Sequence, residues 1–313
     1  MTRVVFMGTP EFAAPSLAAL LREGYEVVRV LTREDQPAGR GRKLVASPVK
    51  ELAEAHGLVI QQPATLRAAD AQAALAALAP DLIVVAAYGL ILPQAVLDLP
   101  RCGCVDVHGS LLPRHRGAAP IAAAILAGDA EAGVSIMLMD AGVDTGPVLS
   151  MASVPIAADD TAGSLTEKLA ILGAELLVAT LPPWLRGEII PRQQPEDGAT
   201  FAPRIEKGEG EIDWHEPAAQ IERRVRAYQP WPSAFTAWDG QRLKILCART
   251  EQKTASGEPG QVIAGDGNAG VITGAGVLWL EEVQLAGKRP LPIDAFLRGA
   301  AGFVGSRLAG VTR

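Results

Sequence analysis

The apolar positions in residues 1–190 predict strands that alternate with helices. Residues 3–7 (RVVFM) and 81–87 (DLIVVAA) are short, nearly continuous apolar runs, as expected of strands buried on both faces of a parallel sheet. Residues 11–22 and 161–181 instead carry apolar side chains at helical spacing. Further predicted strands of this part lie at 25–31, 104–108 and 135–139. The alternation predicts an α/β fold with a doubly wound, mostly parallel sheet.

The pattern changes at residues 189–206, where prolines and glycines lie among polar residues, as in a linker. A predicted helix at 216–228 follows. Short strand-like segments separated by glycine turns then lie at 234–238, 242–248, 261–264, 270–273 and 277–285. Several short strands of this kind predict a small β-barrel, similar to the OB fold. We therefore expect a Rossmann-like catalytic domain at 1–188, a linker at 189–206 and a barrel domain at 207–313.

Composition excludes several classes of protein. Hydrophobic residues make up 49% of the chain and charged residues 20%, which fits an ordered globular protein. No uninterrupted apolar run has the roughly 20 residues of a membrane span, and the chain starts directly in a predicted strand rather than in a signal peptide. We therefore expect a cytoplasmic protein without a membrane partner. The formal net charge of −6 does not itself indicate nucleic-acid binding, but an average cannot exclude a local basic face.

Two familiar cofactor sites do not fit the sequence. The three cysteines lack the spacing of a zinc site, since Cys102 and Cys104 are only two apart and no second pair follows. The turn after the first strand has one glycine, Gly8, where a dinucleotide-binding turn needs three, and Glu11 stands where pyrophosphate would approach. We expect neither a metal nor a bound dinucleotide.

Candidate chemistry lies in the segment 103–120 (GCVDVHGSLLPRHRGAAP). Asp106 and His108 are two residues apart on a predicted strand, so their side chains share one face. The carboxyl end of such a strand is where α/β proteins place their sites. A later loop contains Asp140 and Asp144, and Asp144 could reach and orient the histidine. Spacing alone leaves a packed, inactive histidine as the more common outcome.

The whole pattern of this segment resembles the 10-formyltetrahydrofolate-dependent formyltransferases. The resemblance rests on the strand with Asp106 and His108, the following SLLPRHRGAAP run and the later Asp144-Thr145-Gly146 loop. Other parts of the chain are similar to the family in the same order: 6–13, 37–44, 47–50, 88–93, 212–214, 230–232, 286–288 and 296–299. The second half and the basic loop resemble the members that formylate initiator methionyl-tRNA. Such a member is expected to act as a monomer.

The resemblance implies roles for particular residues. It implies acyl transfer to an amine with Asp106, His108 and Asp144 as the catalytic residues. It also implies that the folate co-substrate lies against Leu90, Ile91, Ser110, Leu111, Leu112, Pro113 and Asp140. The alternative for Leu111 and Leu112 is that both are ordinary core residues.

Asp106 departs from the family, which has asparagine at this position. An asparagine NH2 can donate to the oxyanion that develops on the formyl group, whereas an ionised aspartate can only accept. Three alternatives remain: Asp106 impairs the enzyme, a protonated Asp106 replaces the donor, or the protein binds ligands without catalysis. We expect the first, so that Asp106→Asn would raise turnover steeply.

Basic residues indicate where tRNA would bind. The resemblance favours the loop with Arg40, Arg42 and Lys43, and the second half adds Lys207, Arg223 and Arg226. By charge alone, the loop would be an ordinary solvated surface. A sugar-nucleotide N-formyltransferase would share the folate domain and the catalytic residues. The basic loop and the full second domain argue against that alternative.

Overall fold

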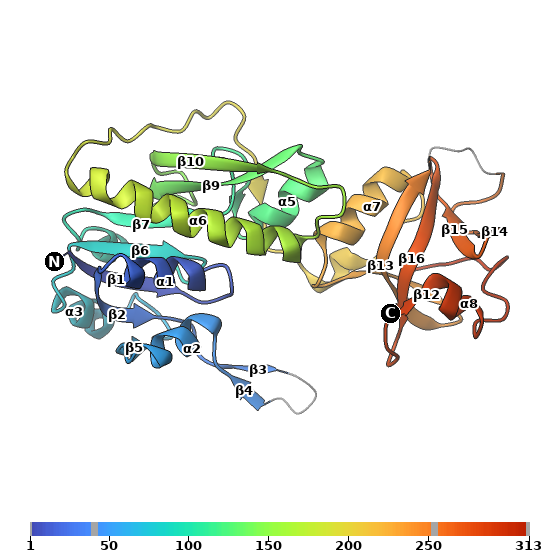
Figure 1. Ribbon diagram of the computed structural model, residues 1–313, viewed down its shortest axis with the longest axis horizontal. Helices are drawn as coiled ribbons and strands as arrows, with labels where there is room; N and C mark the ends of the chain where they lie inside the picture. Colours follow the sequence, from blue (N-terminus) through green and yellow to red (C-terminus); the bar gives the residue numbers. More distant parts are fainter. Residues whose placement is uncertain (1, 39–42, 252–255, 311–313) are drawn as a thin grey trace. The chain divides into compact units, whose positions relative to one another are not determined.

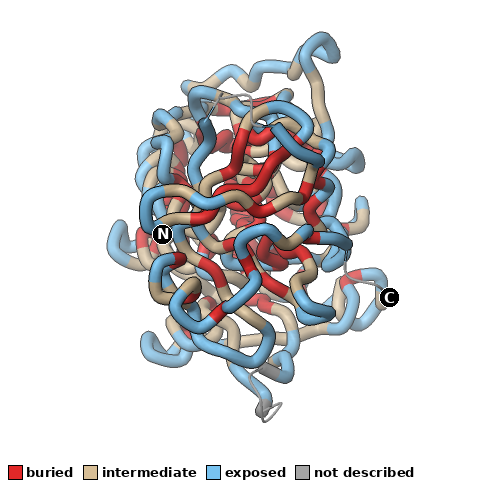
Figure 2. The backbone as a smooth tube through the Cα atoms, turned by 90° about the vertical axis from the view of Figure 1, so that its right-hand side faces the viewer, coloured by how far each residue is buried: buried red, intermediate tan, exposed pale blue. Residues whose placement is uncertain are grey.

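The computed structural model describes residues 2–38, 43–251 and 256–310. The chain forms two compact units. The first consists of Met1–Pro120, Glu131–Pro155 and Thr166–Ala202, and the second of Ile121–Ala130, Ile156–Leu165 and Pro203–Arg313. Figure 2 shows the buried segments (red) mainly inside the molecule and the exposed segments (pale blue) mainly on its outside.

The first unit contains a sheet that, within the described residues, has seven strands in the order β10-β9-β7-β6-β1-β2-β5 (Figure 1). The strands are β1 (Arg3–Gly8), β2 (Glu26–Leu31), β5 (Ile60–Gln61), β6 (Leu82–Ala86), β7 (Cys104–His108), β9 (Glu131–Leu138) and β10 (Val148–Pro155). Strands β5, β2, β1, β6 and β7 run parallel to one another. Strand β9 runs antiparallel to both of its neighbours, β7 and β10. The predicted α/β, mostly parallel sheet is confirmed.

Smaller elements complete the first unit. Strand β3 pairs with β4, and β8 pairs with β11. Their bounds, with those of the helices, are β3 (Gln36–Ala38), β4 (Lys43–Val45), β8 (Arg116–Gly117), β11 (Phe201–Ala202), α1 (Ala14–Arg22), α2 (Pro48–Ala55), α3 (Ala69–Ala76), α4 (Gln94–Leu97) and α6 (Ala162–Leu185).

The strand order places a topological switch point at β1, whose neighbours β2 and β6 lie on opposite sides of it. Every residue of β6 and β7 is buried, which matches the continuous apolar sequence of β6, whereas β7 also buries the polar residues Asp106 and His108. Strand β7 ends at His108, so the predicted catalytic segment begins at a carboxyl end of the sheet. This is the edge at which open α/β sheets bind ligands.

Two features of this sheet differ from the sequence-based prediction. The strand expected at 135–139 is longer, and it runs antiparallel to β7. Strand β10 was not predicted. Past its first two residues, half-buried and exposed positions alternate along β10, because it is an edge strand with one face toward the core. Such a strand lacks the continuous apolar signal that identified β6.

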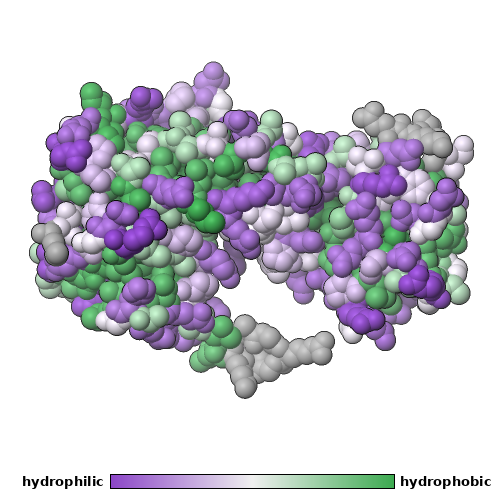
Figure 3. Space-filling view, in the orientation of Figure 1, coloured by the Kyte–Doolittle hydropathy of each residue, from purple (hydrophilic) through white to green (hydrophobic). Residues whose placement is uncertain are grey.

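Helix α6 is the longest helix among the described residues, and Gly173 marks where it approaches the sheet. A side chain at Gly173 would lie within 2.9 Å of Val107 on β7 and 3.3 Å of Val134 on β9. Leu169 and Leu177, four residues to either side of Gly173, are also buried. By length and composition α6 is apolar enough to cross a membrane, which the sequence analysis did not anticipate. Its buried side nevertheless packs on the sheet, whereas its outer side is mixed: Ile171 is exposed there, and Figure 3 shows both hydrophilic and hydrophobic side chains in this region.

The second unit is built on an antiparallel sheet in the strand order β12-β13-β16-β15-β14, with β17 beside β16. Residues 305–309 connect the two edge strands of this sheet, β12 and β14. Ala309 exchanges backbone hydrogen bonds with Ala237 on β12, and Gly305 and Ser306 bond Val262 on β14. This bridging closes the sheet, in keeping with the predicted barrel. The elements are α5 (Pro120–Ala127, of which Pro120 belongs to the first unit), η1 (Lys207–Gly210), α7 (Ala218–Ala227), β12 (Ala234–Trp238), β13 (Gln241–Glu251), β14 (Val262–Gly265), β15 (Asn268–Ile272), β16 (Val277–Leu285), β17 (Leu291–Pro292) and α8 (Ile293–Leu297).

A leucine at position 173 is expected to push α6 away from β7 and β9. Gly173→Leu should lower the free energy of unfolding by about 1–3 kcal/mol, the usual cost of overpacking a core. Ala179→Leu, at an exposed position of the same helix, is the matched control and should change it by less than about 0.5 kcal/mol. Urea unfolding followed by circular dichroism measures both. Equal effects would mean that Gly173 does not set the distance between helix and sheet.

Candidate active site

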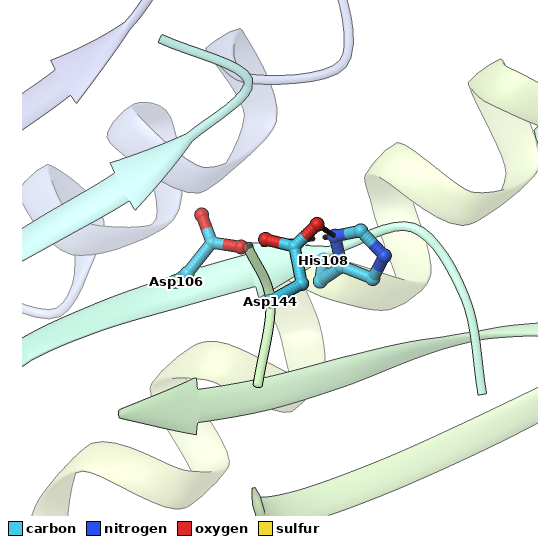
Figure 4. A group of neighbouring side chains, drawn as sticks. All are labelled: Asp106, His108 and Asp144. Atoms are coloured by element: carbon cyan, nitrogen blue, oxygen red, sulfur yellow. Dashed lines mark ion pairs between the residues drawn. The ribbon is translucent and has the colours of Figure 1, made fainter. Parts of the chain in front are cut away.

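Strand β7 and the loop between β9 and β10 bring the three predicted catalytic residues together (Figure 4). His108 Nδ1 lies 3.6 Å from Asp144 Oδ2 and 3.9 Å from Asp106 Oδ2. Asp106 and His108 share one face of β7, as their spacing predicted. In Figure 4, the Asp144 carboxylate lies between the other two side chains in projection. The predicted trio therefore forms one cluster at the carboxyl end of β7.

Asp106 is the buried acid of this cluster. Only 8% of the residue is exposed. Burial raises its pKa well above the usual range, and the negative charge of Asp144 raises it further, while a hydrogen bond from the Val107 N–H opposes the shift. The carboxyl of Asp106 therefore keeps its proton at pH values at which an exposed aspartate has lost it. A protonated carboxyl has an O–H donor, which an ionised one lacks.

The hydrogen bond of His108 decides which face of its ring is basic. His108 Nε2 lies 3.0 Å from the backbone oxygen of His115. A carbonyl oxygen only accepts, so Nε2 donates and carries the hydrogen. In the neutral ring the lone pair is then on Nδ1, the atom that faces Asp106 and Asp144. His108 is thereby set up to take a proton inside the cluster.

The carboxylate of Asp144 is held by a backbone group. Its Oδ2 accepts a 2.7 Å hydrogen bond from the Gly117 N–H, and its φ of 53° lies in the left-handed region. Gly117 has a φ of 117°, and a side chain there would lie 2.5 Å from the Ala202 oxygen. Position 117 therefore requires glycine. Asp140 contributes to the same loop, since its Oδ1 accepts from the Gly142 N–H and the Thr145 hydroxyl.

The residues predicted to line a folate pocket lie in different environments. Leu112 is buried in a core cluster with Met137 and Val148, which is the alternative considered for it. Leu111 is half-buried and packs over Gly133. The Ser110 hydroxyl donates to the Arg114 oxygen. Of the others, Leu90 and Pro113 are half-buried, and Ile91 and Asp140 are exposed.

The predicted tRNA contacts also differ in their surroundings. Arg40 and Arg42 lie outside the described residues, as does the side chain of Lys43. Lys207 is exposed at the start of η1. Two arginines of α7 have partners within the second unit. Arg223 donates to the Ala127 oxygen at the end of α5, and Arg226 pairs with Glu222.

The trio also contains a set of atoms that can bind a cation. One ligand atom each from Asp106, His108 and Asp144 lies within 4.8 Å of the others. Imidazole and carboxylate groups are common zinc ligands. Binding a cation would require Asp106 to ionise, whereas its burial and the charge of Asp144 favour the protonated acid. The site is therefore better suited to hold a proton at Asp106.

Sequence reasoning missed the groups that hold the catalytic residues in place. His115 contributes through its backbone oxygen, for which a sequence carries no signal. Gln194 and Thr200 lie in the predicted linker, yet both contact this site. Their polar side chains among prolines and glycines are also typical of an ordinary surface loop. Gly117 could have been found, because it lies between two predicted site segments.

Comparison with known proteins establishes the class to which this fold and site belong. Residues 2–181 match the formyl transferase family, and residues 204–301 match the formyl transferase C-terminal domain. The chain belongs to the formyl transferase family. It is 50% identical over 312 residues to the methionyl-tRNA formyltransferase of Aromatoleum aromaticum, covering 99% of this chain and 98% of that protein. Within the family, it therefore belongs to the methionyl-tRNA formyltransferases.

Solved structures share the fold at low sequence identity. The methionyl-tRNA formyltransferase from Clostridium thermocellum has a TM-score of 0.55 and 18% identity, covering 88% of this chain and all (100%) of that one. HypX from Aquifex aeolicus in complex with tetrahydrofolic acid has a TM-score of 0.62 and 20% identity, covering 96% of this chain and 48% of that chain. At these identities the likeness concerns the fold.

The buried acid should make stability depend on pH. The pKa of Asp106 is higher in the folded state than the value of about 3.9 in an unfolded chain. The contribution of Asp106 to stability is therefore fully present below about pH 4 and is lost as pH rises toward the folded-state pKa, by about 1.4 kcal/mol per unit of difference. The Asp106→Asn variant should not show this part of the decrease in stability with rising pH. Urea unfolding of both proteins across pH measures it, and identical profiles would contradict the shift.

Proposed function

We propose that this protein transfers the formyl group of 10-formyltetrahydrofolate to the α-amine of methionine on initiator tRNA, for translation initiation. The main support is the Asp106–His108–Asp144 cluster at the end of β7, in a chain half identical to a methionyl-tRNA formyltransferase over nearly its whole length. The reaction needs three things: a proton acceptor, a donor for the oxyanion, and a fixed geometry.

His108 is the proton carrier in this proposal. The neutral amine attacks the formyl carbon, and Nδ1 of His108 takes the proton that the amine loses. The same proton passes to N10 of the folate as the bond between the formyl carbon and N10 breaks. The imidazolium formed in between is stabilised by Asp144, whose Oδ2 lies 3.6 Å from Nδ1. No proton is gained or lost overall.

Asp106 supplies the oxyanion donor in its protonated form. Burial and the charge of Asp144 raise the pKa of Asp106. The proton that Asp106 retains gives position 106 an O–H where the family uses an amide N–H. The structure thus favours the protonated acid among the three alternatives, with activity that depends on pH. Asp144 acts on His108 and holds its own position through Gly117.

The remaining assignments follow from the same proposal. The folate lies at residues 90–91, 110–113 and 140. Because the Leu112 side chain is buried, the folate contacts the backbone of this residue. Residues 1–188 form the catalytic domain. The tRNA is bound by residues 207–313, including Lys207, together with the basic loop of the catalytic domain at Arg40, Arg42 and Lys43. The protein is a cytoplasmic monomer that needs no metal and no membrane.

Formylation of methionyl initiator tRNA, measured across pH, tests this role of Asp106. For Asp106→Asn, the ratio of kcat/KM to that of the unchanged protein should be near one at low pH. The ratio should rise with pH toward about 10²–10³, because only the unchanged protein loses its oxyanion donor. Because both proteins act on the same substrate, the ionisation of its amine cancels in this ratio.

Other outcomes of this assay have distinct meanings. A high ratio at every pH would mean that Asp106 is ionised throughout and the enzyme impaired. A ratio near one at every pH would exclude position 106 as the oxyanion donor. If neither protein formylates the tRNA while an amino-sugar nucleotide is formylated, the proposed acceptor is wrong.

Lys207 is expected to contact phosphate, because it is exposed and basic at the start of η1. Lys207→Ala should raise KM for tRNA, leave kcat unchanged, and reduce the slope of log affinity against log salt by about one. Lys168→Ala, at an exposed lysine of α6, is the matched control. Equal effects of the two variants would argue against a specific contact at Lys207.

A further inference from the structure

The segment after α6 returns to the catalytic cluster instead of leaving the first unit directly. Phe201 and Ala202 form strand β11, which pairs with Arg116 and Gly117 of β8. The Arg116 N–H also donates to the Thr200 oxygen over 2.9 Å. Residues 194–202 thus lie against the loop that follows the catalytic strand. Two polar side chains of this segment reach the backbone around His108 and Asp144.

Thr200 holds the residue whose backbone orients His108. The Thr200 hydroxyl oxygen accepts a 2.8 Å hydrogen bond from the His115 N–H. The oxygen of His115 in turn accepts from Nε2 of His108. His115 has a φ of 57°, a conformation that costs free energy and persists only where neighbours impose it. The bond from Thr200 is one such constraint, so it helps to aim the His115 oxygen at the catalytic ring.

Gln194 holds the loop that carries Asp144. Its side-chain NH2 donates to the backbone oxygens of Asp144, at 2.8 Å, and Gly146, at 2.7 Å. Its side-chain oxygen accepts from Nε of Arg116, a residue that is only 1% exposed. The amide therefore ties the Asp144 loop to the segment after the catalytic strand. Asp144 also has a positive φ, so its backbone needs such support.

We propose that Gln194 and Thr200 are positioning residues of the formyl transfer site. Thr200 sets the ring orientation and tautomer of His108 through His115, and Gln194 sets the place of the Asp144 carboxylate. Among the described residues, the hydrogen bonds of these two side chains to the site go to backbone groups of His115, Asp144 and Gly146, so each acts through the backbone. The kinetic part of this inference rests on the proposed function, whereas the tautomer of His108 can be observed without any substrate.

Thr200→Val tests the link to His108, since valine has the shape of threonine but no acceptor. We expect kcat to fall about 10–100-fold, as for a small misplacement of a catalytic group, with KM nearly unchanged. Thr200→Ser keeps the hydroxyl and should restore most of the activity. In nitrogen-15 NMR of the free protein, the unchanged chain and Thr200→Ser should show His108 protonated on Nε2. Thr200→Val should show a mixture of tautomers.

Gln194→Glu tests the link to Asp144. Glutamate matches the size of glutamine and can still accept from Arg116, but it cannot donate to the two loop oxygens. Gln193→Glu makes the same chemical change one residue away, at an exposed side chain. We expect Gln194→Glu to lower kcat about 10–100-fold and to alter its pH profile, and Gln193→Glu to leave both unchanged.

The outcomes separate positioning from a merely structural role. The proposal for Thr200 is overturned if Thr200→Val loses activity only in proportion to the loss of folded protein and its His108 remains in a single tautomer. Equal kinetics for Gln194→Glu and Gln193→Glu would overturn it for Gln194. If the unchanged protein formylates no tRNA, the proposed function fails, while the tautomer experiment still decides the role of Thr200.

Discussion

The placement of one buried and one half-buried carboxyl group beside one imidazole is the constraint on which the rest of the site depends. Asp106 is 8% exposed and His108 6% exposed, so water screens the charges around them poorly. The half-buried carboxylate of Asp144 lies close to Asp106, and the more buried of the two acids responds by keeping its proton. One neutral acid, one imidazole and one carboxylate is the arrangement that this constraint leaves.

The fold satisfies this constraint by holding the cluster with backbone groups. The His115 oxygen fixes the hydrogen on Nε2 of His108, and the Gly117 N–H binds the Asp144 carboxylate. His115, Gly117 and Asp144 all have positive φ angles. Such angles are unfavourable for His115 and Asp144, so they need contacts from elsewhere. Gln194 and Thr200 make those contacts from a segment some 50 to 85 residues further along the chain.

The sequence predicted the parts of this structure that depend on local pattern. Strands β7, β12 and β16 have the predicted bounds, and the carboxyl end of β7 was the predicted site, because short strand-like segments bounded by turn residues are local signals. Strand β10, with its alternating burial, was missed. The returning segment looked like a linker, because its pairing with β8 joins residues 85 positions apart. The resemblance to the family located Asp144, which spacing alone left as one of several acidic residues.

In the proposed reaction, the charge of the cluster explains why position 106 must be neutral. Before the attack, a protonated Asp106, a neutral His108 and an ionised Asp144 carry one negative charge together. When His108 holds the amine proton and the oxyanion has formed, the imidazolium offsets one of the two negative charges, so the total is again one.

An asparagine at 106 gives the same total at every pH. An ionised Asp106 would add a second negative charge within the unscreened pocket, next to the oxygen where charge develops. A buried, protonated aspartic acid can thus replace asparagine only as long as its surroundings hold that proton, and burial together with Asp144 is what holds it. The carboxylate that stabilises the imidazolium is therefore the same one that keeps the oxyanion donor neutral.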